Sequence, residues 1–231
     1  KEMRDPYSLC PAGHDFTQRQ HNISVEYDED YDSWAGPFIM ASINTRVVLR
    51  SNALVDGHYA ENFKYDEAML TSSEKKGEKM AKKLSSGTKA SMFMMAFAPM
   101  RWLATRVFLP SPGEGPTPEQ QLKGCYDLRL LGRTKQGEKV RVRVTGDRDP
   151  GYGSTAKMLA QAGISLRRDV DEDEVGGGFW TPATAFNDKL ITRLVDYAGM
   201  GFELESISQA VPKTEETIAD AFNESAPSAQ N

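Results

Sequence analysis

Residues 143–159 read Arg-Val-Thr-Gly-Asp-Arg-Asp-Pro-Gly-Tyr-Gly-Ser-Thr-Ala-Lys-Met-Leu and predict a strand, a turn and the start of a helix. Apolar and polar residues alternate as far as Thr145, which is typical of a strand with one buried face. Glycines and a proline follow over 146–153, and a helix is expected from about Ser154 to Leu166. Strand-to-helix turns of this kind often bind ligands, because the first N–H groups of a helix have no partner within it.

The rest of the chain repeats these two kinds of element, so we expect an α+β fold. Alternating residues predict further strands over 23–27, 63–70, 125–131 and 202–207. The segment between 125–131 and 139–145 is short enough for an antiparallel hairpin. Apolar spacings and Gly/Pro signals predict helices at about 37–55, 72–84 and 181–198, the second of them ended by Ser85-Ser-Gly87. We therefore predict a mixed, largely antiparallel sheet with helices packed mainly on one face.

The chain has 231 residues, enough for one large domain with its own core. The polar residues 1–22 predict an N-terminal arm, and residues 23–210 the α+β domain. The Ser/Ala/Glu-rich residues 211–231 predict a flexible tail. The opening residues have no apolar core like that of a signal peptide, and we expect the chain to be part of a longer protein.

Charge and cysteine content narrow the function classes. The net charge of −5 gives no global electrostatic case for binding nucleic acid. Two cysteines, Cys10 and Cys125, cannot form a disulfide framework in a chain of this length, which favours an intracellular, reducing compartment. Three histidines without a second ligand pair at suitable spacing predict no metal site.

The turn at 146–153 is the first candidate binding site. A phosphate or carboxylate would meet the N–H groups at the helix start, helped by a nearby hydroxyl or ammonium group. The candidate substrate-binding residues there are Asp149, Gly151, Tyr152, Gly153, Thr155 and Lys157. The alternative is that the glycines only make a tight connection. Neither Gly-x-Gly-x-x-Gly nor a P-loop pattern is present, so no cofactor-binding residue is predicted in this chain.

A polar strip on the 37–55 helix is the second candidate. Asn44 and Arg46 are predicted to bind substrate, because a guanidinium group can hold a carboxylate through two hydrogen bonds. The alternatives are a solvated helix face and a buried Asn/Arg network.

Residues 90–109 form the most apolar window of the sequence. Pro99 is expected to split or kink any helix there. A single membrane span is disfavoured by Arg101 and Arg106. Two interpretations stay open: an interfacial helix with lysines near anionic headgroups, and a helical hairpin packed on its own sheet or on a partner.

Several segments in order resemble the saccharopine dehydrogenase-like oxidoreductases, a family that includes the bacterial trans-acting enoyl reductases. The resemblance covers about residues 5–205. Its segments are Gly36–Leu54, Phe63–Met69, Pro110–Pro116, Val144–Gly146 with Asp149–Tyr152, Thr155–Leu159, and Gly176–Gly178 followed by Thr181–Ala183.

This resemblance implies a two-part protein with an N-terminal Rossmann domain that binds NAD or NADP. The chain matches only the second, α+β part, which shapes the substrate cleft and often the dimer contact. The partners implied are a Rossmann half, in cis or in trans, and a second copy of the chain. Some eukaryotic relatives associate with membranes or lipid droplets, which suits a lipid-surface contact through 90–109. No catalytic residue is carried over. The alternative function is a non-catalytic interaction subunit derived from the family, docking through the same segment.

Overall fold

The computed structural model describes residues 5–60, 62–107, 110–111 and 113–208. The chain divides into two compact units, which are described separately here. The first combines 1–115 with 166–187, and the second combines 116–165 with 188–231. The described part of the predicted arm, residues 5–22, contains turns and no helix or strand. The predicted tail, 211–231, lies outside the described residues.

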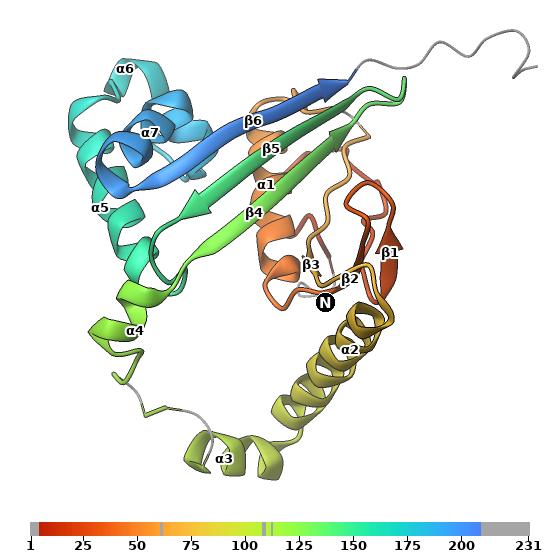
Figure 1. The fold of residues 1–231 in the computed structure, drawn as a ribbon. Coiled ribbons are helices and arrows are strands. Elements are labelled where there is room, and N and C mark those ends of the chain that lie inside the picture. The colour runs from red at the N-terminus through yellow and green to blue at the C-terminus, as the bar shows by residue number, and fades with distance from the viewer. Residues whose placement is uncertain (1–4, 61, 108–109, 112, 209–231) are drawn as a thin grey trace, which may run out of the picture. The chain divides into compact units, whose positions relative to one another are not determined.

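The first unit contains a small antiparallel sheet in the order β1-β2-β3 (Figure 1). Its strands are β1 (Glu26–Asp28), β2 (Ser33–Pro37) and β3 (Ala68–Leu70). The predicted strands at 23–27 and 63–70 are thus shorter than expected. β2 was not foreseen: the prediction that a helix begins at Gly36-Pro37 is wrong, because both residues end this strand. Gly36 is buried, and a Cβ at this position would lie 3.2 Å from the Cα of Ala81, so the glycine permits a close strand–helix approach.

The helices of ten or more residues that lie wholly within the first unit are α1 (Ala41–Leu54), α2 (Lys75–Ala96) and α3 (Ala98–Val107). α2 packs against β2 through its first half, where Gly77, Ala81 and Ser85 are buried. The prediction that Ser85-Ser-Gly87 ends this helix is wrong. Ser85 faces inward and its hydroxyl lies 3.3 Å from that of Ser24, so packing overrides the low helix propensity. The split expected at Pro99 is confirmed, since α2 ends before Phe97 and α3 begins at Ala98.

The second unit is built on a longer antiparallel sheet in the order β4-β5-β6. The predicted hairpin is confirmed as β4 (Tyr126–Arg133) and β5 (Lys139–Gly146), and the predicted last strand as β6 (Met200–Ser208). Every strand pairing among the described residues is antiparallel. The predicted α+β class is therefore confirmed, with the strands divided between two sheets.

Helices accompany this sheet before β4 and after β5. They are α4 (Pro118–Lys123), most of α5 (Gly153–Arg168) and the part of α7 (Pro182–Ala198) from residue 188 on. The short α6 (Glu172–Val175) lies in the first unit. α7 ends at Gly199 as predicted, because this residue has φ +66°, which suits glycine. The core of the second unit lies on one sheet face, where Leu194, Ala198 and Met200 pack with Tyr126, Val144, Met158, Leu190 and Phe202.

Candidate functional site

The turn between β5 and α5 is closed by the carboxylate of Asp149. Its Oδ1 accepts the backbone N–H groups of Gly151 and Tyr152, both at 3.0 Å. Its Oδ2 accepts the N–H of Gly153 at 2.7 Å. The N–H groups on which the predicted anion site depended are thus occupied by a side chain of the turn itself. This arrangement caps the helix and complements its positive end.

Two further candidates in this turn hold it in place. The Thr155 hydroxyl donates to the carbonyl of Pro150 at 2.7 Å. The Lys157 ammonium donates to Oδ1 of Asp147 at 2.6 Å and to the carbonyl of Ala198 at 2.7 Å. The lysine therefore ties α5 to the end of α7 and satisfies one of that helix's last carbonyls.

The ion pair with Lys157 changes the titration of Asp147. The hydrogen bond from the ammonium group holds the pKa of the Asp147 carboxyl below its usual range, against a smaller opposing effect of burial.

Tyr152 differs from its neighbours, because its side chain is exposed and no hydrogen bond from its hydroxyl is found among the described residues. The structure thus brings the six predicted residues of the turn together, and it engages most of their polar groups internally.

Asn44 belongs to a different cluster, in the first unit. Its side-chain amide donates to the carboxylate of Glu67 at 2.9 Å, and the hydroxyl of Tyr65 donates to the same carboxylate at 2.6 Å. Burial, and then the hydrogen bond to Glu67, raise the pKa of Tyr65, so this hydroxyl remains a donor. The cluster joins α1 to the segment that leads into β3.

Arg46 lines a groove that sequence reasoning did not foresee. The groove has a volume of about 710 Å³ and lies between the arm 5–22 and α1. Nε of Arg46 donates to the hydroxyl of Ser8 at 3.2 Å, and a guanidinium NH donates to the carbonyl of Ser42. Arg46 and Asn44 thus contact different partners, and both lie in a different unit from the turn residues.

Three of the side chains that line this groove are aromatic rings stacked on one another. The rings of Tyr7 and His14 stack with centroids 5.6 Å apart, and those of His14 and Phe16 with centroids 6.2 Å apart. The Tyr7 hydroxyl donates to the carbonyl of Gln18 at 2.9 Å, which holds the arm in a compact shape. Arg19 and Asp5 also line the groove, so two cationic side chains, one carboxylate and an aromatic stack face one space. This arrangement can bind an anionic group attached to an apolar or planar one.

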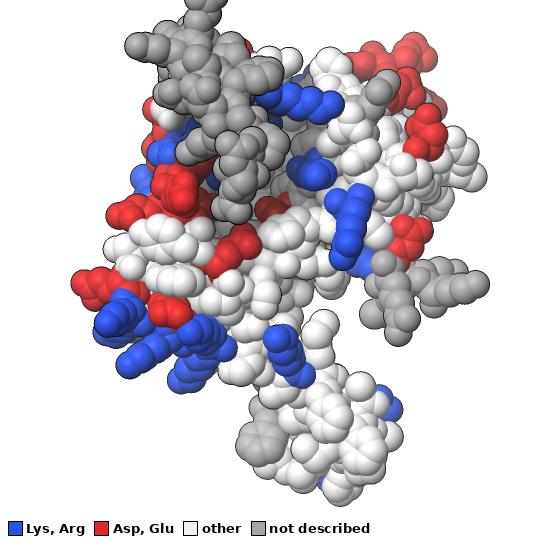
Figure 2. Space-filling model, turned by 90° about the vertical axis from the view of Figure 1, so that its right-hand side faces the viewer, with Lys and Arg blue, Asp and Glu red and all other residues white. Residues whose placement is uncertain are grey.

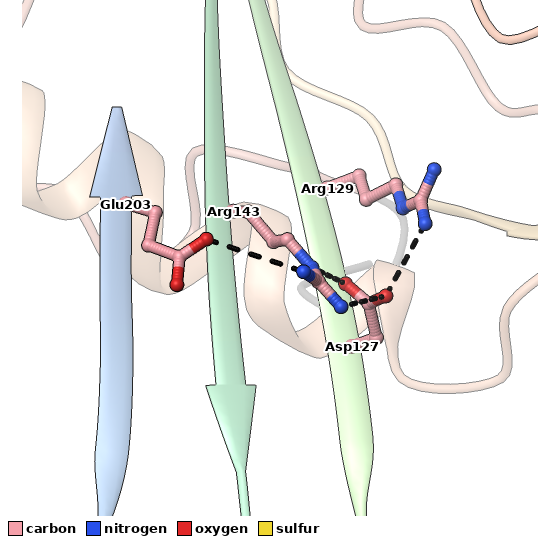
Figure 3. A network of polar contacts seen from close by, with 4 residues as sticks. All are labelled: Asp127, Arg129, Arg143 and Glu203. Carbon is pink, nitrogen blue, oxygen red and sulfur yellow. Dashed lines mark hydrogen bonds and ion pairs between the residues drawn. The ribbon is translucent and has the colours of Figure 1, made fainter. Parts of the chain in front are cut away.

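The polar face of the second sheet carries an ion-pair network (Figure 3). Arg143 donates through Nε and a guanidinium NH to both oxygens of Asp127, each at 3.1 Å. Arg129 also reaches Asp127, and Glu203 lies 4.0 Å from Arg143. Arg143 holds the pKa of Asp127 below its usual range. These residues lie on adjacent strands and explain the alternating arginines of β5 as a structural feature of an exposed sheet face.

The described residues contain no metal cluster, and the turn before α5 does not fit a dinucleotide. No group of three or more His, Cys, Asp or Glu residues suitable for a metal ion occurs there, and Cys10 and Cys125 are free thiols. A dinucleotide pyrophosphate needs open N–H groups at a helix start. The Asp149 carboxylate fills that position, and the adjoining sheet is antiparallel, so these residues do not fit the cofactor. In the described residues, no helix has both the length and the apolar character needed to cross a bilayer.

Comparison with known proteins gives one consistent result. Identity is 35% over 164 residues with a Mycobacterium tuberculosis protein whose name assigns it provisionally to the trans-acting enoyl reductases. It is 34% over 164 residues with the trans-acting enoyl reductase of Mycobacterium bovis, and 31% over 168 residues with that of Mycobacterium ulcerans. Each alignment covers 70% of this chain. No family model matches the chain, and neither does any solved structure.

The chain spans 39% of the length of these curated relatives. It is therefore similar to part of a trans-acting enoyl reductase over most of its own length. This agrees with the resemblance found in the sequence as far as the enoyl reductases are concerned.

Proposed function

We propose that this chain is the substrate-binding and dimerisation part of an NAD(P)-dependent oxidoreductase of the saccharopine dehydrogenase-like type. The observation that supports it is the 34–35% identity to proteins named trans-acting enoyl reductase. The name of these relatives favours an enoyl group as the substrate among the carbonyl, imine and enoyl groups that such chemistry can reduce. Such a reduction would add a hydride to the β-carbon of the enoyl group and a proton to the α-carbon, and a nicotinamide bound outside these residues would supply the hydride.

The cofactor would be held outside these residues, in a Rossmann half of the same or another chain. Two features support this assignment. Asp149 already binds the N–H groups of the turn, and the sheets are antiparallel, whereas dinucleotides bind at a helix start beside a parallel sheet. The proposed role of this chain is to bind and orient the substrate.

The groove beside α1 is the best candidate for that task. Arg46 and Arg19 supply positive charge, and Tyr7, His14 and Phe16 supply flat apolar surface. A carboxylate, or the phosphate of a carrier group joined to an enoyl thioester, matches this combination. Asn44 is proposed to act indirectly, because its amide is bound to Glu67 and positions α1.

The test measures NAD(P)H oxidation by the full-length protein that contains this chain. We expect oxidation with a 2-enoyl thioester and none with the saturated acyl thioester. Arg46→Leu is expected to raise KM for the thioester more than it lowers kcat, because the guanidinium group would bind substrate and transition state alike. Arg167→Leu, at an exposed site on α5, is the matched control. Oxidation that does not depend on the enoyl group would contradict the proposal, and tight binding of NADPH by residues 1–231 alone would contradict the placement of the cofactor.

A second candidate is the non-catalytic interaction subunit. The exposed apolar residues of α2 and α3 favour it, because an enzyme needs no such surface for its chemistry. It predicts that the full-length protein oxidises no NAD(P)H with any of these thioesters.

A further inference from the structure

The aromatic rings of the groove beside α1 form a surface rather than a column. The ring centroids of Tyr7 and His14 lie 5.6 Å apart, those of His14 and Phe16 6.2 Å, and those of Tyr7 and Phe16 6.4 Å. In a column, the outer two rings would be separated by the sum of the other two distances, so these centroids form a triangle. Tyr7 is buried, whereas His14 is exposed and Phe16 half-buried, and the planes of the last two differ by 16°. They present a nearly flat apolar area larger than one ring, which suits a fused planar ring system.

Two guanidinium groups line the same groove as these rings. The hydroxyl of Ser8, 3.2 Å from Nε, and the carbonyl of Ser42 orient the guanidinium group of Arg46. Both of these partners are neutral, so the two contacts fix the group without cancelling its charge. The side chain of Arg19 is exposed and makes no hydrogen bond or ion pair with the residues that the structure describes. The groove therefore offers positive charge beside the aromatic surface, as a phosphate group requires.

Two further polar side chains bear on what the groove can bind. Asn22 lines it with an exposed carboxamide, whose adjacent donor and acceptor match the amino group and a ring nitrogen of adenine. Asp5 lines it with a carboxylate, but its Oδ1 accepts the backbone N–H of Tyr7 at 2.9 Å and so holds the arm. The volume of about 710 Å³ lies within the range of about 300 to 1,000 Å³ found for small-molecule sites. The groove thus has room for more than a single anionic group.

Positive charge elsewhere in the first unit lacks this combination. Figure 2 shows Lys and Arg side chains gathered above its lowest lobe, which is the α2–α3 hairpin formed by the end of α2 and by α3. On α2, Lys82 forms an ion pair with Glu78, and neither Lys79 nor Lys83 lines the groove. Charge alone therefore does not select the groove, and the aromatic surface beside the charge does.

We propose that the groove binds the phosphorylated adenosine end of a coenzyme A thioester, with adenine on the rings and the phosphates at Arg19 and Arg46. The thioester in this assignment rests on the proposed function, whereas recognition of a phosphorylated purine rests on the groove alone. A thioester can also be carried by a protein-bound phosphopantetheine arm, which has no purine. Such an arm would use the cations and leave the aromatic surface uncovered, whereas adenosine bisphosphate matches the cations, the rings and the carboxamide together.

Isothermal titration calorimetry of the full-length protein with adenosine 3′,5′-bisphosphate tests the proposal. We expect saturable binding at least about tenfold tighter than that of inorganic phosphate or phosphopantetheine, because a stacked base adds about this much affinity. Saturating NADP⁺ should leave this binding unchanged. Binding no tighter than that of phosphopantetheine would overturn the proposal. Binding that NADP⁺ abolishes would also overturn it, because the bisphosphate would then occupy the dinucleotide site.

Two variants at exposed positions separate the roles of ring and charge. His14→Leu removes a planar ring and should raise the Kd for both adenosine and its bisphosphate, by about tenfold. Arg19→Gln removes a charge and should raise the Kd for the bisphosphate while leaving that for adenosine unchanged. The controls His58→Leu and Arg167→Gln change an exposed histidine and an exposed arginine outside the groove and should bind as the parent does. Bisphosphate binding that neither groove variant weakens would overturn the proposal.

NAD(P)H oxidation by the full-length protein separates this proposal from the proposed function. We expect the KM for a 2-enoyl-coenzyme A to be at least about tenfold lower than that for the same enoyl group on pantetheine. Equal KM values without bisphosphate binding would overturn the coenzyme A site and leave the proposed function intact. Bisphosphate binding that depends on His14 and Arg19, in a protein that oxidises no NAD(P)H, would support the nucleotide site and contradict the proposed function.

Discussion

At the scale of single residues, Asp149 decides what the turn before α5 can do. Its carboxylate takes three backbone N–H groups that a bound anion would need. Asp149→Ala is expected to destabilise the protein by about 1 to 2 kcal/mol, the usual cost of losing a helix cap. It should also create an anion site, so that phosphate raises the Tm of the variant and leaves the Tm of the parent unchanged. Phosphate stabilisation of the parent would show instead that the turn binds anions with Asp149 in place.

The pair of Asp147 and Lys157 gives the stability of the second unit a pH dependence of known sign. The folded-state pKa of Asp147 lies below its unfolded value, because Lys157 donates to the carboxylate. The ion pair therefore stabilises the fold above the unfolded pKa of about 4, and this contribution is lost as the pH falls through the folded pKa. The difference in Tm between the parent and Asp147→Asn should be largest above about pH 5 and should shrink toward pH 3. Asp196→Asn, at an exposed site on α7, should show no such trend.

At the scale of elements, α2 shows where packing prevails over local preference. Gly87 lies within the helix, and a Cβ there would meet no atom within 4 Å. Gly87→Ala should therefore raise stability by up to about 1 kcal/mol through helix propensity. Gly77 is the matched position in the same helix, but its Cβ would lie 2.0 Å from the carbonyl oxygen of Ser72. Gly77→Ala should lower the Tm, and thermal melts of the two variants with opposite signs would establish the distinction.

Elements with a clear period could be predicted, and those fixed by contacts distant in sequence could not. The alternation of Val140, Val142 and Val144 was sufficient for β5 and its hairpin, since a period of two has one structural meaning. β2 was missed because Gly36 and Pro37 are typical of a turn or a helix start, and only the close approach of α2 makes them suit a strand. The break inside α7 was also missed. Asn187 adopts φ +49° and ψ −137°, which no local pattern indicates.

The candidate site residues also fall into a group whose proximity could be predicted and a group whose proximity could not. The residues of the turn are near one another in sequence, so their proximity could be predicted, but the capping role of Asp149 depends on which side-chain rotamer the turn selects. The groove brings Tyr7, His14 and Arg19 next to Arg46, across an arm without regular structure. No periodicity specifies the path of such an arm, so the groove could not be predicted.

At the scale of the whole molecule, the α2–α3 hairpin is expected to contribute little to the stability of the fold. Residues 90–107 bury only Ala104 among their side chains, and the contacts of α3 are mainly with α2. Replacing Lys89–Val107 by a Gly/Ser linker of the same length should therefore change the Tm by less than about 5 °C, because little apolar area leaves the core. Under the proposed function, the same variant should keep NAD(P)H oxidation with a water-soluble enoyl thioester. Loss of cooperative melting would show instead that the hairpin is part of the core.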